Sequence, residues 1–289
     1  TIDNDLDGLI DMSTIVDFYT PNELKTSTIL TELAMLGTDA AAMTGGGLTV
    51  AAGGMLSLVG AQPKTLTGGT LTNSGTTNLS GTADTTLSGG ALWDNFGVLN
   101  LGGGSRIVLA GDGAATLVNR GTGVVNDTSS NATPITVGAA TRTGKSFMNA
   151  GRYTKALGSA GVQTLDVPMT NTGTIEVLVG TLIANGFPAN SGILDIRSGA
   201  SFSTAGLPLT NSLFGLLKGD GTLILGGETF TNNGTVAPGA SPGTLTIDGN
   251  YVQGPGGTLA IELGGSVPGT DYDVLKIGGT AALDGTLVV

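Results

Sequence analysis

The sequence predicts an all-β fold, a parallel β-helix (β-solenoid) whose coils are about 20–22 residues long. The main observation is an Asn-x-Gly triplet that returns along the chain at similar intervals. It starts at Asn73, Asn95, Asn119, Asn149, Asn171, Asn190 and Asn232, which are 22, 24, 30, 22, 19 and 42 residues apart. Asn211 divides the last interval into two of 21 residues. Such an interval is too short for a domain, but it matches one coil of a stack in which no coil is stable alone.

Composition and alternation support the same fold class. Glycine supplies 51 of the 289 residues and charged residues supply 11%, whereas average domains have about 7% glycine and about 25% charge. Hydrophobic residues make up 39% and alternate with threonine and polar residues in short runs, which predicts an ordered, strand-rich chain. A sandwich of antiparallel hairpins would not repeat one corner signature every 20 or so residues, so the solenoid is preferred.

Residues 1–43 differ from the rest of the chain. They carry eight acidic residues against one lysine, a net charge of −7, whereas the remaining 246 residues carry −4 of the total of −11. Thr20 and Glu23 have the spacing of a helix capping box, and Pro21 stands at the first helical position. We therefore predict a short acidic loop followed by a helix over residues 21–36 that covers the open end of the stack.

Residues 44–289 form the predicted β-helix. Short strands such as 174–179 are expected to point Leu, Ile and Val inward and Thr, Asn, Asp and Glu outward, with glycine at the corners. The repeated asparagine is expected to form a ladder, its side-chain amide bonding the amides of the coils above and below. The long interval between Asn119 and Asn149 predicts an insertion at about residues 127–145, either a binding loop or a plain surface loop.

The carboxyl-terminal part of the chain resembles a known family. Residues 232–253 read NNGTVAPGASPGTLTIDGNYVQ and residues 272–289 read YDVLKIGGTAALDGTLVV. These runs are similar to the distal passenger region of bacterial autotransporters and related large adhesins. The resemblance covers residues 230–289 most clearly and residues 69–229 loosely. It implies an exported, surface-displayed, right-handed β-helix, and residues 1–43 are not part of the family pattern.

The best candidate for a bound ion is a calcium loop near the amino terminus. Its candidate ligands are Asp3, Asp5, Asp7, the carbonyl of Leu9, and Asp11. Carboxylates at alternate positions, a glycine at the sixth position and a carbonyl at the seventh match a loop that wraps one small cation. The twelfth position is threonine where a bidentate glutamate is usual, and the loop resembles those of dockerins and thrombospondin-type repeats. We expect structural calcium here, with a solvated acidic tail as the alternative.

Other polar groups are weaker candidates. The absence of cysteine and histidine excludes thiolate and imidazole metal sites and Ser-His-Asp catalysis. Asp195 and Arg197 could serve a β-helix glycan lyase or hydrolase, but an ordinary cross-strand ion pair is the preferred interpretation. The Gly-Asp-Gly runs at residues 111–113 and 219–221 are isolated, so we interpret them as turns and not as calcium-binding repeats.

These features predict a non-catalytic protein, the stalk or adhesive segment of a large bacterial adhesin, secreted and displayed at the cell surface. Its expected partner is a ligand on a host, matrix or neighbouring-cell surface. The alternative is a structural subunit of a calcium-ordered extracellular filament, sheath or surface layer that associates end to end. The net charge of −11 argues against nucleic acid as a partner. The sequence contains no run of 18 apolar residues, so no transmembrane segment is predicted. The chain starts at Thr1 and stops at Val289 within an apolar strand, so we expect a piece of a longer protein.

Overall fold

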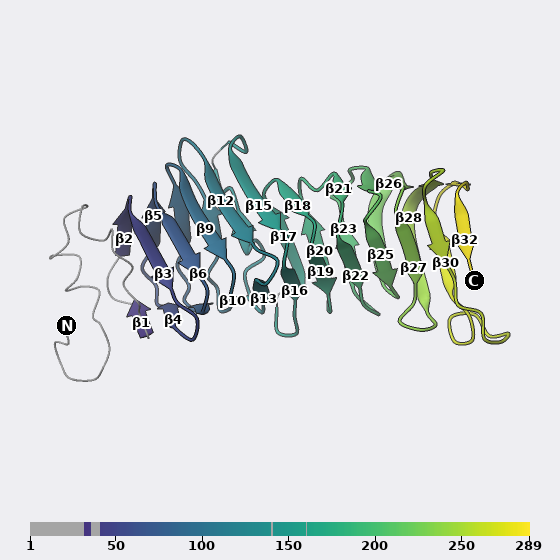
Figure 1. Cartoon of the computed structure of the whole chain (residues 1–289), viewed down its shortest axis with the longest axis horizontal. Coiled ribbons are helices and arrows are strands. Elements are labelled where there is room, and N and C mark those ends of the chain that lie inside the picture. The colour runs from purple at the N-terminus through teal and green to yellow at the C-terminus, as the bar shows by residue number, and fades with distance from the viewer. Residues whose placement is uncertain (1–31, 36–40, 140, 160) are drawn as a thin grey trace.

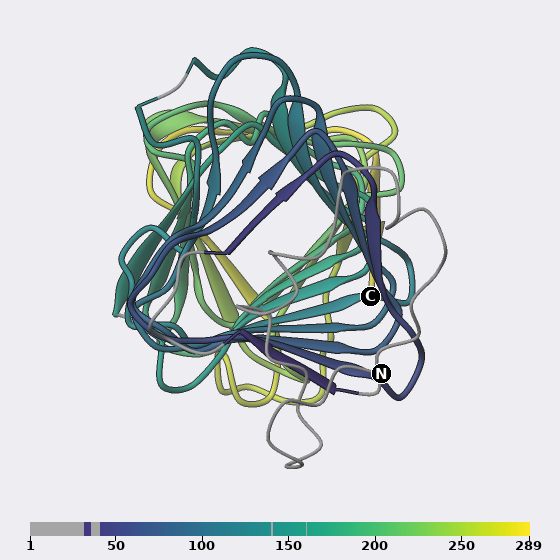
Figure 2. The same cartoon turned by 90° about the vertical axis from the view of Figure 1, so that its left-hand side faces the viewer.

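The chain folds as a parallel β-solenoid, which confirms the predicted fold class. The structure, a computed structural model, describes residues 32–35, 41–139, 141–159 and 161–289. Coil follows coil along one long axis from the amino-terminal to the carboxyl-terminal end (Figure 1). Viewed along that axis, the strands form three faces around a common interior (Figure 2). Successive coils pair through parallel strands, as the registers of β4 (Met55–Leu58) with β7 (Thr76–Leu79) and of β10 (Val98–Leu101) with β13 (Val124–Asp127) illustrate.

We name the three faces A, B and C in the order in which the chain crosses them. Face A is a sheet of β1 (Glu32–Met35), β4 (Met55–Leu58), β7 (Thr76–Leu79), β10 (Val98–Leu101), β13 (Val124–Asp127), β16 (Arg152–Lys155), β19 (Thr174–Val177), β22 (Ile193–Ile196), β25 (Leu216–Gly219), β27 (Thr235–Pro238), β29 (Thr258–Ala260) and β32 (Thr286–Val288). Face B contains β2 (Ala41–Thr44), β5 (Lys64–Thr67), β8 (Thr85–Ser88), β11 (Ile107–Leu109), β14 (Ile135–Thr136), β17 (Val162–Asp166), β20 (Thr181–Ala184), β23 (Ser201–Ser203) and β30 (Val274–Ile277). Face C contains β3 (Gly47–Val50), β6 (Thr70–Asn73), β9 (Ala91–Asn95), β12 (Ala115–Asn119), β15 (Lys145–Asn149), β18 (Met169–Asn171), β21 (Ala189–Asn190), β24 (Leu209–Asn211) and β31 (Ala281–Ala282). Two long strands, β26 (Thr222–Asn232) and β28 (Thr244–Gln253), cross from face B to face C, so that these two faces join into one sheet.

The amino-terminal end differs from the prediction. Strand β1 (Glu32–Met35) pairs in parallel with β4, so the last part of the helix predicted over residues 21–36 is wrong. The first coil offers an edge of backbone hydrogen-bonding groups at this position, and pairing with that edge overrides the local helical pattern. Strand β2, which covers residues 41–44, likewise pairs with β5, so pairing between coils already includes residues ahead of the predicted start of the β-helix at residue 44. The remainder of the predicted helix and the acidic loop lie outside the described residues.

The interior is filled by alternate side chains of the three faces. Leu87, Leu117 and Ile175, one from each face, are fully buried. The neighbours of Leu87 along β8 are partly exposed, and β7 shows the same alternating burial. Aromatic residues also fill the core, where Phe147 and Tyr153 meet edge to face with ring centroids 5.9 Å apart. Within the described residues, no helix is long and apolar enough to cross a membrane.

The predicted asparagine ladder is present at the corner between faces C and A. It consists of Asn73, Asn95, Asn119, Asn149, Asn171, Asn190, Asn211 and Asn232, all of which are at most 2% exposed. From Asn73 to Asn211, each Nδ2 donates to the asparagine Oδ1 of the next coil at 2.7–2.9 Å. The ladder begins beside Val50, which leaves the buried Oδ1 of Asn73 without a partner among the described residues. It ends where Gln253 takes the position of the next asparagine and Tyr251 bridges to it.

A column of glycines runs beside the ladder and directly precedes the face A strands from β7 to β27. Its members are Gly75, Gly97, Gly123, Gly151, Gly173, Gly192, Gly215 and Gly234. A Cβ at Gly173 would lie 2.1 Å from the carbonyl oxygen of Gly151 in the coil before, a distance that no side chain tolerates. Glycine is therefore required by the close stacking of the coils. After Asn119 the column uses Gly123 and not the Gly121 of the triplet, because two extra residues are inserted at this corner.

Candidate functional site

The predicted calcium ligands Asp3, Asp5, Asp7, Leu9 and Asp11 lie outside the described residues, so calcium binding there stays a prediction. In the part of the chain that the structure describes, no three acidic side chains are grouped in a way that could hold a metal ion.

The two Gly-Asp-Gly runs form corners of the solenoid. Lys145 donates from Nζ to the carbonyl oxygens of Gly111 and Gly113 at 2.9 and 2.5 Å, so a lysine ammonium group occupies the concave side of that turn. Gly219 has a φ of 108° at the tight corner between β25 and β26, and a Cβ there would lie 2.1 Å from the carbonyl oxygen of Ile196. Both runs therefore act as turn residues.

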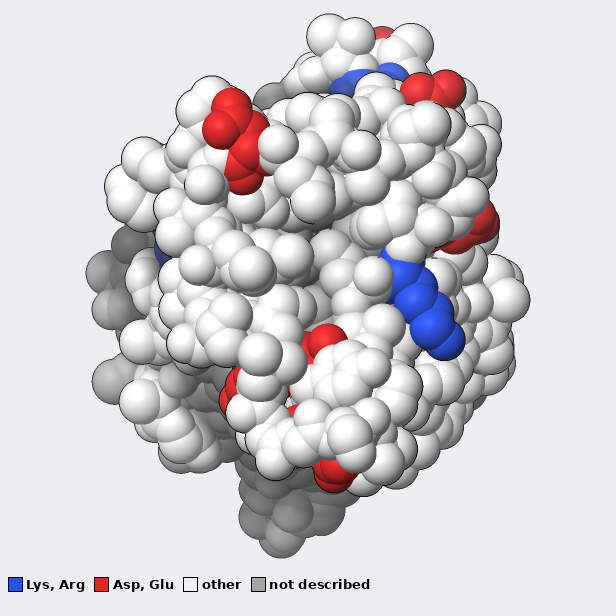
Figure 3. Space-filling model, turned by 90° about the vertical axis from the view of Figure 1, so that its right-hand side faces the viewer, with Lys and Arg blue, Asp and Glu red and all other residues white. Residues whose placement is uncertain are grey.

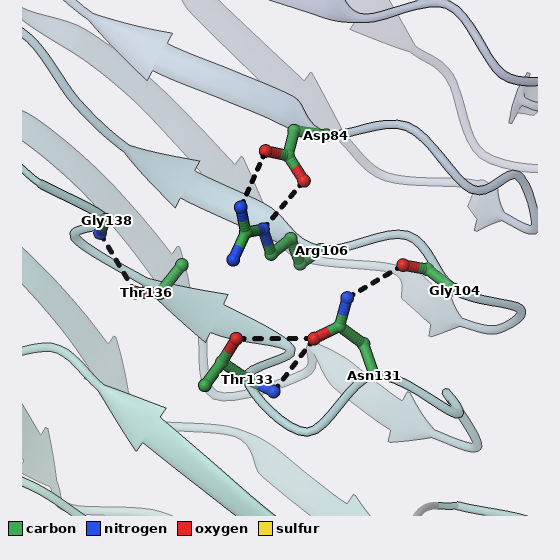
Figure 4. Close-up of polar contacts among 7 residues, drawn as sticks. All are labelled: Asp84, Gly104, Arg106, Asn131, Thr133, Thr136 and Gly138. Carbon is green, nitrogen blue, oxygen red and sulfur yellow. Dashed lines mark hydrogen bonds and ion pairs between the residues drawn. The ribbon is translucent and has the colours of Figure 1, made fainter.

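The predicted insertion is divided between two corners. One part links β13 to β14 and the other links β14 to β15. Asn131 anchors the first part, because its Nδ2 donates to the carbonyl of Gly104 while its Oδ1 accepts from the backbone and hydroxyl of Thr133 (Figure 4). In the same region Arg106 forms a bidentate pair with Asp84 of the coil before. The first part of the insertion is thus tied down onto the preceding coil.

A buried polar cluster lies where this insertion starts. Asp127, Ser129, Tyr153, Lys155 and Gln163 are all fully buried. The carboxylate of Asp127 accepts from the Tyr153 hydroxyl at 2.7 Å and from Gln163 Nε2 at 3.2 Å. Burial raises the pKa of Tyr153 well above its ordinary value, and the charge and hydrogen bond of Asp127 add to this. Burial lowers the pKa of Lys155, while the charge of Asp127 opposes that shift.

Two adjacent coils create this cluster by breaking the apolar pattern. Asp127 is the register partner of Leu101 on one side and of Lys155 on the other, and Lys155 is followed by Val177. Opposite charges therefore replace apolar side chains at one inward position in neighbouring coils. In the sequence, this cluster corresponds to two charged residues at strand positions where apolar residues are expected. That the two positions are neighbours can be recognised only once the register is known.

Three exposed cations gather on the outer side of face A. This face A charge cluster consists of Arg152, Glu176, Asp195, Arg197 and Lys218, of which Glu176, Asp195 and Lys218 are register partners in successive strands. Arg197 Nη2 lies 3.1 Å from both Glu176 Oε1 and Asp195 Oδ2, and Lys218 Nζ lies 3.2 Å from Asp195 Oδ2. Arg152 pairs with the second oxygen of Glu176. The interpretation of Asp195 and Arg197 as an ion pair is confirmed, and the pair extends into a network.

The network buries its acids and exposes its bases. The side chains of Glu176 and Asp195 are 7% and 5% exposed, whereas those of Arg152, Arg197 and Lys218 are 54%, 41% and 39% exposed. Burial alone would raise the pKa of Glu176, but hydrogen bonds from Arg152 and Arg197 outweigh it and hold the pKa below its ordinary value. The surface that meets solvent is therefore cationic, on a chain whose net charge is −11.

A groove of about 450 Å³ opens beside this cluster, at the corner between faces A and B. We call it the corner groove. Asp195, Arg197 and Lys218 line its part nearer the amino-terminal end of the stack. The loop of residues 239–243 and the loop of residues 261–273 line the rest, and these project at the lower right of the molecule in Figure 1.

Differences in loop length create the groove. Between β25 and β26 the chain turns in the two residues 220–221, whereas the next two coils use residues 239–243 and 261–273 at the same corner. Asp273 braces the two long loops together, because its oxygens accept from the backbone N–H groups of Gly243 and Glu262 at 2.8 and 2.9 Å. The groove could not be located from sequence alone, since its position depends on loop lengths compared across aligned coils.

The corner groove offers ionic and hydrogen-bonding groups above an aliphatic surface. Ser241 Oγ bonds the exposed carboxylate of Glu262 at 2.9 Å, and Ala237, Ile261 and Val288 supply apolar contacts. Figure 3 shows the carboxyl-terminal end of the stack, where acidic side chains form small separate groups on a mostly uncharged surface. Asp195 is held by two cations, which is an arrangement for fixing charge and not for transferring protons. Of the larger aromatic residues, Trp93, Tyr153 and Tyr251 are buried in the core.

Comparison with known proteins gives one informative similarity. The chain is 31% identical over 228 residues to outer membrane protein A of Rickettsia rickettsii, a match that covers 73% of this chain. The chain spans only 9% of the length of that relative. No protein-family model matches the sequence. No solved structure matches it either.

Proposed function

We propose that this chain is a non-catalytic β-helix segment of a bacterial surface protein, of the autotransporter-passenger type, that is secreted and displayed outside the cell as a stalk or adhesive segment. The observation that carries the proposal is the similarity to outer membrane protein A over 228 residues, a length that covers most of the coil stack. The ligand would belong to a host, matrix or neighbouring-cell surface. A non-catalytic role agrees with the face A charge cluster, where each buried carboxylate is paired with two cations.

Surface display can be tested on cells that make the protein. Antibodies raised against the purified chain should label intact cells, and external protease should remove that signal without lysing the cells. Labelling that appears only after the cells are permeabilised would contradict display. An internal cytoplasmic protein, followed in parallel, controls for leakage.

We also propose structural calcium at Asp3, Asp5, Asp7, Leu9 and Asp11, on the basis of the alternating carboxylates alone. Calorimetric titration of the purified chain with Ca²⁺ should detect one site, and the D5N/D7N variant should lose it. Unchanged heats in that variant would place any calcium elsewhere. Electron microscopy of the same samples with calcium and with chelator tests the filament alternative, since only a calcium-ordered polymer would fall apart on chelation.

A further inference from the structure

The exposed side-chain charges of the corner groove are of opposite sign at its two ends, whereas Asp195 and Asp273 of the lining are buried. Arg197 and Lys218 lie on coils nearer the amino-terminal end of the stack, and Glu262 lies after β29, two coils beyond Lys218. Coils stack about 4.8 Å apart, so Lys218 and Glu262 are separated by about 10 Å along the axis. A ligand that satisfies both ends must itself carry a negative and a positive group at a similar spacing.

We propose that the corner groove binds a short, extended peptide segment that carries a carboxylate side chain and a basic side chain two residues apart. The carboxylate pairs with Arg197 and Lys218, and the basic group pairs with Glu262. In an extended peptide, side chains two residues apart lie on the same side at about 6.6 Å, and the length of a lysine side chain covers the remaining distance. This inference deepens the proposed adhesive function, on which it rests, by naming the class of ligand.

The groups in the groove are held ready for such a ligand. Asp195 lies beneath the two cations and fixes their positions, while its Oδ1 and the Nε of Arg197 are buried without a partner among the described residues. Asp273 and Ser241 fix the backbone and the carboxylate of Glu262. Because these groups are ordered before binding, little conformational entropy is lost when the ligand arrives.

A peptide fits the groove better than an acidic polysaccharide does. A polyuronate carries only negative charge, so it would meet the cations at one end and be repelled by Glu262 at the other. The uncharged part of the lining is mostly aliphatic, and no aromatic ring on which a sugar could stack lines the groove. Ala237, Ala260 and Ile261 instead offer a surface suited to small side chains and extended backbone.

The test uses the purified full chain and a pentapeptide, acetylated and amidated, with glutamate at its second position, lysine at its fourth and alanine elsewhere. Two control peptides replace either the glutamate or the lysine by glutamine. Calorimetry or NMR titration should detect binding below about 10 mM, and each control peptide should bind roughly two- to fivefold more weakly.

Variants then assign each charge to its partner. K218Q should weaken binding of the peptide with glutamate by about two- to fivefold but leave the glutamate-free control peptide unaffected. E262Q should weaken binding of the peptide with lysine to a similar degree and leave binding of the lysine-free control peptide unchanged. K276Q and E228Q are matched controls that remove exposed charges outside the groove, and they should leave affinity unchanged.

Three results would overturn the proposal. They are failure of all three peptides to bind up to about 10 mM, equal loss of affinity for charged and control peptides in K218Q, or binding of trigalacturonate in preference to any peptide. These outcomes are separable from the test of surface display. If the chain binds the peptide but intact cells do not expose it, the proposed adhesive role is contradicted and the peptide site stands. If intact cells expose the chain but it binds no peptide, the peptide site is contradicted and the proposed surface display stands.

Discussion

Each asparagine of the ladder after Asn73 connects three coils with one small side chain. Asn149 shows the pattern: its Oδ1 accepts from Asn119 at 2.8 Å, and its Nδ2 donates to Asn171 at 2.7 Å and to the carbonyl of Thr174 at 2.9 Å. The amide is 2% exposed, so water cannot replace these bonds. A second, outer ladder of Asn78, Asn100 and Asn126 on face A makes similar bonds but is only half-buried.

This difference predicts unequal costs for removing the two kinds of asparagine. N149A leaves buried groups on two neighbouring coils without partners, and should lower the free energy of unfolding by about 2–4 kcal/mol. N100A, in the half-buried ladder, should cost less than about 1 kcal/mol. Chemical denaturation followed by circular dichroism measures both. Equal losses of stability in N149A and N100A would mean that burial does not account for the contribution of the inner ladder.

The glycine column gives a steric prediction. G173A places a Cβ about 2 Å from the Gly151 carbonyl and should separate the coils, with a loss of stability above about 3 kcal/mol. G121A is the matched control, because nothing lies within 4 Å of its Cβ. It should be neutral or stabilise by up to about 1 kcal/mol, since alanine restricts the unfolded chain. Comparable denaturation midpoints for the two variants would refute the close stacking.

Glu176 predicts a dependence of stability on pH. Its pKa is lower in the folded chain than its ordinary value of 4.5, so its contribution is present above about pH 4.5 and is lost as the pH falls through the folded pKa. E176Q should therefore be less stable than the parent chain by about 1–2 kcal/mol at pH 7, and the gap should narrow as the pH falls below 4.5. Melting curves across this range test the prediction, with E228Q, an exposed glutamate, as the control. A gap that stays constant with pH would exclude the charge of Glu176 as its cause.

Individual strands show how far pattern alone determines structure. Strand alternation and the ladder positions were predictable because period-two burial and a repeated corner residue are local signals. The helix end at residues 32–35 was not, since pairing of β1 with β4 depends on an edge that only the folded stack supplies. The glycine that belongs to the glycine column after Asn211 could not be predicted either. Insertion of two residues moves it to Gly215, and sequence spacing cannot distinguish this from a lost repeat.

The two adjacent coils that contain Asp127 and Lys155 carry a prediction at this scale. D127L leaves the fully buried Lys155 without its opposing carboxylate and should cost about 3–5 kcal/mol. D127L/K155V restores the apolar residues typical of the neighbouring coils, Leu101 and Val177, and should recover part of that loss. Recovery should be incomplete because Tyr153 and Gln163 also lose an acceptor. A double variant less stable than D127L would show that the two charges do not compensate each other.

Across the whole molecule, the coils vary in length only where the chain turns corners. Ladder intervals range from 19 to 30 residues, yet the asparagines remain in register from Asn73 to Asn232. Extra residues are therefore accommodated in the corner loops, and the corner groove results from the unequal lengths of these loops. The ion pairs beside it could be predicted from Asp195 and Arg197, whereas the groove itself required the three-dimensional alignment of loops from separate coils.

The most direct test of the account is hydrogen exchange of the asparagine side-chain amides, measured by NMR on the chain labelled with ¹⁵N at asparagine. A continuous buried ladder predicts that the Nδ2 protons of Asn95, Asn119, Asn149, Asn171, Asn190 and Asn211 exchange far more slowly than those of the half-buried outer ladder. Uniformly fast exchange of all asparagine amides would contradict the ladder and, with it, the parallel in-register stack on which the proposed surface function depends.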